Sequence, residues 1–282
     1  MIKLVVDSAT DINQDEAEKL GVICMPIQVR IGDEEFLDGV NLQHRQFYEK
    51  LIESASLPQT SQINEYRWEE KFAEEVESGA TVIAITLSSK LSGTYGCAVK
   101  AAKKFGGKVF VVDSLNACIG ERILCDYALR LISGGKLTAE EIVKELNAAK
   151  GKIQLIAVLD TLKYLKKGGR ISSVAAFTGE LLSIKPVVSV VGGEVKCVGK
   201  AMGSKKGNNL LMQLTEECGG INFDMPYAVG YSGLSDECLK KYLRDSEVLW
   251  KGKTENVPAY PVGCTIGTHI GPNGVAVAFF AK

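Results

Sequence analysis

The sequence predicts an α/β protein made of two α/β domains: an N-terminal domain with a mainly parallel, three-layer sheet, and a C-terminal domain with a mixed sheet and helices. Three observations support this prediction. The chain has 282 residues, enough for two domains of ordinary size. Short apolar runs alternate with helical patterns through the first half, as in βαβ units. The second half carries Gly192-Gly193 between two apolar runs, a strong signal of an antiparallel hairpin.

The first half reads as strands separated by helices. Residues 2–6 form an apolar run typical of a buried strand, and the helix that follows ends at Gly21. Gly32-Asp33 predicts a turn that returns the extended segment 22–31 through Phe36. The expected elements are helix 13–20, helix 45–53, loop 57–62, helix 64–77, strand 81–86, helix 92–105, strand 108–112 and helix 116–133. Helices between strands imply crossovers and a parallel sheet covered on both faces.

The second half has a different pattern. Thr138 with Glu141 three residues later is a capping box at the start of helix 137–150. Strand 153–159, two short helices, the hairpin around Gly192-Gly193 and two terminal extended runs around residues 271–274 predict a mixed sheet. Helices 205–218 and 236–244 are expected on either side of strand 227–231 in the sequence. We place the domain boundary between residues 155 and 156, giving domains 1–155 and 156–282.

Composition excludes several classes of protein. The formal net charge is −1, which gives no basic field for nucleic acid or an anionic membrane surface. No apolar stretch approaches the roughly 18–20 residues of a membrane span, and the N-terminal apolar run is too short for a signal peptide. Eight cysteines without a CxxC pair and only two histidines indicate reduced thiols, no metal site and no cofactor. We therefore expect a cytoplasmic protein.

Short polar side chains follow three predicted strands, at Asp7-Ser8-Ala9-Thr10, Ser88-Ser89 and Asp113-Ser114. In a parallel sheet these strand ends lie at the edge where ligands bind. The plain alternative is helix capping, because Ser, Thr and Asp are favoured N-caps.

The segment Leu91-Ser92-Gly93-Thr94-Tyr95 is the most informative of these positions. Ser92 stands at the expected start of a helix, where free N–H groups and the helix dipole favour an anion, and Gly93 permits close approach. The loop Thr60-Ser61-Gln62 adds donors, with an ordinary turn as the alternative. His269 lies in a glycine-bounded segment that we expect to be a loop. From the residues alone, the anion is either a carboxylate or a phosphate.

These segments together resemble the DegV family of fatty-acid-binding proteins. The resemblance runs through nearly the whole chain, in a fixed order. The matching pieces are Asp7-Ser8-Ala9-Thr10-Asp11, Pro58-Gln59-Thr60-Ser61-Gln62, Leu91-Ser92-Gly93-Thr94-Tyr95, Val112-Asp113-Ser114, Leu165-Lys166-Lys167-Gly168-Gly169-Arg170-Ile171, Ile184-Lys185-Pro186 and Gly267-Thr268-His269 with Gly271-Pro272.

The resemblance implies a long-chain fatty acid such as palmitate lying between the two domains. It implies that Thr60 and Ser92 contact the ligand carboxylate and that His269 completes the polar network, with Ser61, Gly93, Thr94 and Arg170 supporting it. The family further implies lipid transport and, in many bacteria, presentation of the acid to a separate ATP-dependent fatty acid kinase that makes the acyl phosphate. The apolar stretches 156–165 and 174–191 are candidates for lining the acyl tail, or else plain domain core.

Two positions leave the kinase partnership open. Arg170 is either a surface arginine after a C-cap glycine or a residue that orders the interdomain region or meets the kinase. Relatives that serve the kinase often carry an arginine two positions after the lysine of the pair Gly199-Lys200, where this chain has Met202. Asn273 also replaces a glycine that is usual in the family.

The alternative function is a serine-dependent hydrolase of an acyl substrate, using Ser92 and His269. No GxSxG segment is present, and the sequence identifies no acidic partner for His269. A nucleotide-binding function is disfavoured, because Gly252-Lys253-Thr254 lacks the first glycine of a P-loop. The sequence therefore favours a non-catalytic ligand-binding protein.

Overall fold

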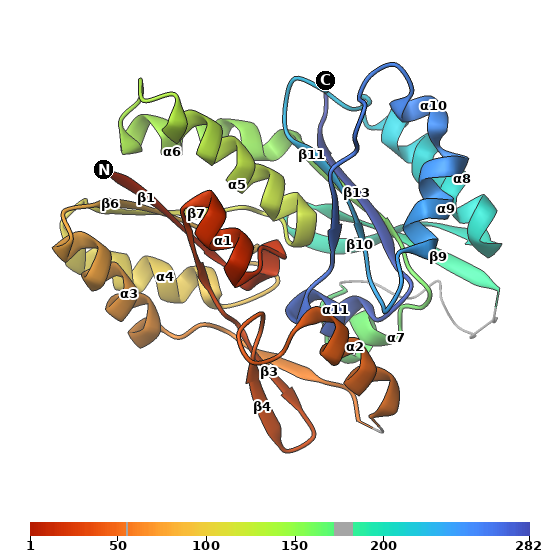
Figure 1. The fold of residues 1–282 in the computed structure, drawn as a ribbon, viewed down its shortest axis with the longest axis horizontal. Coiled ribbons are helices and arrows are strands. Elements are labelled where there is room, and N and C mark those ends of the chain that lie inside the picture. The colour runs from red at the N-terminus through yellow and green to blue at the C-terminus, as the bar shows by residue number, and fades with distance from the viewer. Residues whose placement is uncertain (55, 172–182) are drawn as a thin grey trace.

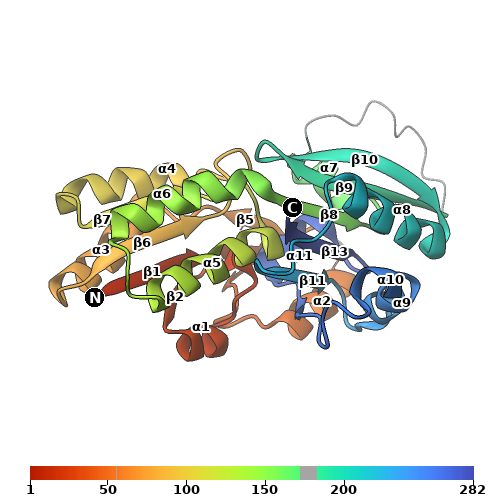
Figure 2. The same ribbon diagram turned by 90° about the horizontal axis from the view of Figure 1, so that it is seen from above.

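The computed structural model describes residues 1–54, 56–171 and 183–282. Three sheets organise these residues (Figure 1). A four-stranded sheet has the order β2-β1-β6-β7, a six-stranded sheet the order β10-β9-β8-β13-β11-β12, and a small sheet the order β4-β3-β5. The first two lie in the two halves of the molecule, which Figure 2 shows from above.

The four-stranded sheet is parallel throughout and lies between two helical layers, as predicted. Figure 1 shows α5 and α6 on one face and α3 and α4 on the other. The strands are β1 (Ile2–Asp7), β2 (Val22–Met25), β6 (Thr81–Thr86) and β7 (Val109–Asp113). The helices are α1 (Gln14–Leu20), α3 (Glu65–Glu77), α4 (Thr94–Ala102), α5 (Cys118–Ser133) and α6 (Ala139–Ala149), with the 3-10 turns Ser8–Thr10, Lys103–Phe105 and Lys150–Lys152.

Local signals in the sequence set several of these helix ends. Asn13 caps α1 by accepting from the N–H of Glu16, and Gly21 ends it in the left-handed conformation at φ 67°. Thr138 and Glu141 form the expected capping box of α6.

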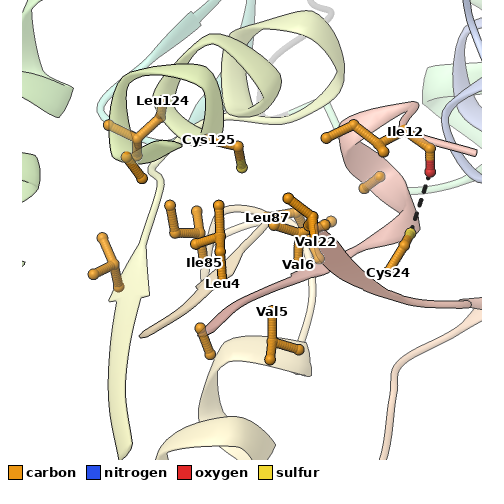
Figure 3. Close-up of a cluster of buried hydrophobic side chains, with 14 of the residues drawn as sticks. Leu4, Val5, Val6, Ile12, Val22, Cys24, Ile85, Leu87, Leu124 and Cys125 are labelled. Atoms are coloured by element: carbon orange, nitrogen blue, oxygen red, sulfur yellow. Dashed lines mark hydrogen bonds between the residues drawn. The ribbon is translucent and has the colours of Figure 1, made fainter. Parts of the chain in front are cut away.

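Apolar side chains fill both faces of this sheet. Figure 3 shows Leu4 and Ile85 on the side that faces Leu124 of α5, whereas Val5 points to the opposite side. This alternation follows from the two-residue period of a strand, and burial on both faces explains why β1 and β6 are apolar almost throughout.

The six-stranded sheet mixes parallel and antiparallel pairs, as predicted. Its β9–β10 hairpin turns at Gly192-Gly193, both with positive φ. The strands are β8 (Ile153–Val158), β9 (Ile184–Val191), β10 (Glu194–Met202), β11 (Tyr227–Tyr231), β12 (Ala259–Pro261) and β13 (Val275–Phe280). The helices of this half are α7 (Lys163–Lys167), α8 (Gly203–Glu217), α9 (Glu237–Asp245), α10 (Glu247–Trp250) and α11 (Cys264–Ile270).

The expected domain boundary falls inside β8, and Ile153 to Val158 all pair within the second sheet. Helix α5 packs against β1 and β6 of the first sheet and against β8, β11 and β13 of the second. One apolar cluster therefore runs through both halves, from Leu4 to Phe280. Division of the chain into domains 1–155 and 156–282 remains a prediction, and the register of β8 favours a boundary just before residue 153.

The small sheet corrects one sequence expectation. Residues Gln59–Ser61 form strand β5, which pairs with β3 (Gln28–Ile31), whereas we expected a loop there. The strand is short and polar, so it lacks the apolar alternation from which a strand can be predicted. Strand β4 (Glu34–Leu37) completes the sheet after the predicted Gly32-Asp33 turn, and α2 (His44–Glu53) follows.

Two short helices were expected between strand 153–159 and residue 186; α7 is one of them, and residues 172–182 of this interval lie outside the described part of the chain. All eight cysteines are free thiols, and half of them are buried, among them Cys24 and Cys264. Among the described residues, no helix is both long and apolar enough to cross a membrane.

Candidate ligand-binding site

A cavity of about 290 Å³ lies between the two main sheets. This volume is close to the lower end of the roughly 300–1,000 Å³ that small-molecule sites occupy. Its wall is mostly apolar, and residues from both halves of the chain contribute to it. The apolar residues that line it are Ile27, Leu87, Leu91, Ala117, Leu155, Ala157, Leu165, Val188, Val190, Val195, Ile266, Ile270 and Ala276.

Part of this wall was predicted. Ala157 and Leu165 come from the expected stretch 156–165, and Val188 and Val190 come from the expected stretch 174–191, whose residues 174–182 lie outside the described chain. Ile156 points instead into the separate core beneath the second sheet, because side chains alternate along β8. Sequence reasoning placed His269 of α11 at the site but did not predict that Ile266 and Ile270 of the same helix, or Ala276 of β13, line the cavity.

Polar side chains gather at one part of the cavity wall. Thr60, Ser92 and His269 all line it, and we call these three residues the clamp. Thr60 comes from β5, Ser92 from the turn two residues before α4, and His269 from the last turn of α11. Two sequence expectations are corrected: His269 lies on a helix and not in a loop, and α4 begins at Thr94 and not at Ser92.

Thr60 and His269 are joined directly, with 2.9 Å between Oγ1 and Nε2. Burial, together with the nearby positive charge of Arg170, lowers the pKa of His269 to about 4, so the imidazole is neutral at pH 7. Its Nδ1 is buried and has no hydrogen-bond partner among the described residues. A buried N–H without a partner is less tolerable than a buried lone pair, so the proton belongs on Nε2. Nε2–H then donates to Thr60, whose own O–H is left free to donate.

Ser92 is held in a comparable way. Its Oγ accepts from the N–H of Thr94 at 3.2 Å and lies 3.0 Å from the Thr94 hydroxyl. Thr94 is buried, and its hydroxyl accepts from the N–H of Ile63 at 3.3 Å. The Thr94 hydroxyl can therefore donate to Ser92, which leaves the Ser92 O–H free. Thr94 supports the site from behind and does not line the cavity itself.

The remaining predicted residues lie around the clamp. Ser61 and Gly93 line the cavity, and a Cβ at Gly93 would lie 1.9 Å from Oε1 of Gln62, so a larger residue there would displace this exposed side chain. Gln62, also at the cavity, follows directly in the Thr60-Ser61-Gln62 segment. Arg170 is exposed at the rim, where it donates to the carbonyls of Leu91 and Gly168. Its bond to Leu91 links the two halves of the chain, and a role for Arg170 in ordering the interdomain region remains a prediction.

The polar side chains at the other strand ends make hydrogen bonds to backbone groups. Asp7 accepts from the N–H groups of Ala9 and Leu87, and burial raises its pKa to about 7. Ser88 donates to the carbonyl of Gly193, and Asp113 accepts from the N–H groups of Ser89 and Leu115. The capping alternative therefore describes these positions better than a role in ligand binding. Within the described chain, no group of three or more acidic, histidine or cysteine side chains is arranged to hold a metal ion.

The clamp opens toward the surface on a second side. A depression of about 820 Å³ is lined by Thr60, His269 and Arg170 and also by Lys163 and Lys167 of α7. No aspartate or glutamate lines it among the described residues. The polar end of the cavity is therefore next to a cationic surface.

The buried histidine predicts a pH dependence of stability. Because its folded-state pKa of about 4 lies below the ordinary value of 6.5, His269 contributes stability that is complete above pH 6.5 and is lost as the pH falls toward 4. Between pH 7 and pH 4, delipidated wild-type protein should lose about 3 kcal/mol more unfolding free energy than His269→Gln. Urea unfolding of both proteins across this range measures the difference, and other titrating groups cancel in it. Parallel pH profiles would contradict the assignment.

The fold and the site define a class: a two-sheet α/β protein with an apolar cavity whose polar end is lined by hydroxyl groups. The model of the DegV family, described as "Uncharacterised protein, DegV family", matches residues 1–282, and the chain belongs to this family.

The relatives match over nearly their full length. A DegV domain-containing protein of Caldanaerobacter subterraneus subsp. tengcongensis is 31% identical, covering 100% of this chain and 99% of the relative. A DegV family protein from Thermus thermophilus, described by its fatty acid binding, is 29% identical with a TM-score of 0.88, covering 100% of this chain and 99% of that one. A stearic acid-binding protein from Eubacterium ventriosum is 25% identical with a TM-score of 0.87, covering 99% and 97%.

Proposed function

We propose that this protein binds one long-chain fatty acid, with its carboxylate at Thr60 and Ser92 and its acyl chain in the apolar cavity. The observation that carries the proposal is the state of the two hydroxyls. Thr60 Oγ1 lies 2.9 Å from His269 Nε2, and Ser92 Oγ accepts from the N–H of Thr94. With the Nε2–H tautomer argued for His269 and the Thr94 hydroxyl donating to Ser92, each hydroxyl keeps an O–H to donate. Two donors at the end of an apolar cavity suit a ligand group that only accepts, and an ionised carboxylate is such a group.

The two ends of the ligand contribute differently to the free energy of binding. Each buried methylene contributes about 0.8 kcal/mol, so the tail supplies most of the gross affinity. The carboxylate loses its hydration on entering the site and needs hydrogen bonds to compensate. The hydroxyls therefore fix orientation and select an acid over a neutral lipid. The fatty acid binding described for the Thermus thermophilus protein and the stearic acid of the Eubacterium ventriosum protein support this ligand class.

Removal of either hydroxyl tests the proposal. Ser92→Ala and Thr60→Val should each weaken palmitate binding by roughly 10- to 100-fold, the usual worth of a hydrogen bond to a charged group. Ser89→Ala is the matched control, because Ser89 is exposed and lies outside the cavity. Mass spectrometry of lipid extracted from the purified proteins, with titration of delipidated protein, measures the effect. Equal lipid loads in all four proteins would show that the clamp is misplaced.

We propose a non-catalytic role. A serine hydrolase needs its histidine on the serine, but His269 is hydrogen-bonded to Thr60, and none of the hydrogen bonds among the described residues joins it to Ser92. Ser92 should accordingly not react with a fluorophosphonate probe. Covalent labelling at Ser92 would support the hydrolase instead.

The same proposal includes a cytoplasmic location and presentation of the bound acid to a fatty acid kinase. The cationic depression beside Thr60 and His269 supports presentation, since a phosphoryl donor could reach the carboxylate from that side. Met202 is 65% exposed on β10, where many kinase-serving relatives have an arginine. The absence of this arginine argues against presentation to a kinase. Turnover of palmitate-loaded protein by a purified fatty acid kinase decides between the two.

A further inference from the structure

Helix α11 carries His269 but has no N-terminal cap of its own. The residue at the N-cap is Gly263, which offers no side chain. The first N–H groups of a helix have no partner inside the helix, and here they are buried. Two aspartates from the other end of the sequence, Asp38 and Asp11, accept hydrogen bonds from these N–H groups.

Asp38 makes the larger contribution to this cap. Its Oδ1 accepts from the N–H of Cys264 at 3.1 Å, and its Oδ2 accepts from the N–H of Thr265 at 3.0 Å. Asp11 accepts from the N–H of Gly263 at 2.8 Å. Asp38 is itself only 4% exposed, and Ser8 donates to its Oδ2 at 3.1 Å.

These contacts close a ring of structure around the clamp. Asp38 directly follows β4, which pairs with β3; β3 pairs with β5, and Val29 of β3 lies opposite Thr60. From Thr60 the ring returns through His269 to α11 and back to Asp38. A seven-residue helix is about 10 Å long and stiff, so holding its first turn also fixes the last turn, where His269 lies.

We infer that Asp38 is a positioning residue for fatty acid binding: by capping α11 it holds His269 Nε2 within hydrogen-bonding distance of Thr60. This inference rests on the proposed function for its effect on affinity, although the geometry of His269 can be measured without a ligand. Asp11 has a smaller role, because one oxygen accepts one N–H and an asparagine could do the same.

Asp38→Asn is the informative variant. It keeps the shape of the side chain but replaces one acceptor oxygen with an NH₂ group, which leaves an N–H of α11 unpaired. The protein contains only His44 and His269, so imidazole NMR signals of 15N-labelled protein can be assigned from a single His44 variant. In delipidated Asp38→Asn, the Nε2 proton of His269 should exchange with water about tenfold faster than in wild type. Asp11→Asn and the exposed Asp33→Asn should leave it nearly unchanged.

Palmitate binding supplies the second measurement. Asp38→Asn should weaken binding by about tenfold, and adding it to Thr60→Val should weaken that variant no further, because both act through the same contact. An unchanged His269 signal in Asp38→Asn, or fully additive losses in the double variant, would overturn the inference. If Asp38→Asn does not fold, Ser8→Ala removes one donor to Asp38 and should shift the His269 signal in the same direction; no shift would equally overturn it. Failure of wild-type protein to bind palmitate would refute the proposed function and leave the NMR result to decide this one.

Discussion

Ala157→Phe is expected to abolish fatty acid binding while the protein still folds. Ala157 lies on β8 with its side chain on the cavity, so a phenyl ring there occupies space that the acyl tail needs. Each methylene displaced from the cavity removes about 0.8 kcal/mol, and displacing several of them weakens binding by more than about 100-fold. Palmitate titration of delipidated protein and lipid analysis of the purified variant measure the loss.

The control for this variant adds the same bulk elsewhere. Val198 lies on β10 and is 40% exposed, so Val198→Phe should bind palmitate as wild type does. The melting temperature of Ala157→Phe without ligand should match or exceed that of wild type, because the ring fills an empty cavity. A full lipid load in Ala157→Phe would mean that the tail lies outside this cavity.

Gly267→Ala is expected to destabilise the protein by about 1–3 kcal/mol, the range seen when a packed core is overfilled. Gly267 lies in the middle of α11, and an added Cβ would be 2.6 Å from Cε1 of Phe47 and 2.7 Å from the hydroxyl of Tyr48. Both rings are fully buried and pack against each other, so neither has room to move. The methyl group must therefore push α11 away from α2, which also displaces His269.

A second helical glycine gives the opposite expectation. Gly96 lies in α4 with nothing within 4 Å of an added Cβ, so Gly96→Ala should stabilise the protein by up to about 1 kcal/mol through helix propensity alone. Urea unfolding of both variants tests the pair. Similar effects of the two substitutions would show that the contact with Phe47 and Tyr48 does not constrain α11.

Sequence reasoning succeeded where the determinants are local. Gly21 ends α1, Thr138 with Glu141 starts α6, and Gly192-Gly193 turns the β9–β10 hairpin, each through contacts within a few residues. The alternation of apolar strands and helices was likewise sufficient for the parallel sheet and its two helical layers. These features depend on the local backbone preferences of the residues involved, which do not require contacts with distant parts of the chain.

Prediction from the sequence failed where residues distant in the chain determine the local structure. The segment around His269 is rich in glycine and reads as a loop, but Asp38 and Asp11 supply the cap that makes α11 a helix. Thr60 was expected in a loop, and only its pairing with β3 makes a strand of residues 59–61. The proximity of Thr60 and His269 is itself a property of the folded chain, since 209 residues separate them. Resemblance to a family suggested their partnership, and the residues alone did not.

The position of α5 determines how a ligand can leave. Because this helix packs against both main sheets, rotating the two halves apart as rigid bodies would expose buried side chains such as Ile119, Ile123 and Leu124 to water. That exposure makes wide opening rare, so the fatty acid proposed as ligand is expected to leave through smaller local movements at the rim. The residence time of the bound acid is then set by the frequency of those movements and not by its affinity alone. We therefore expect the proposed fatty acid to be released slowly, at a rate limited by these movements at the rim.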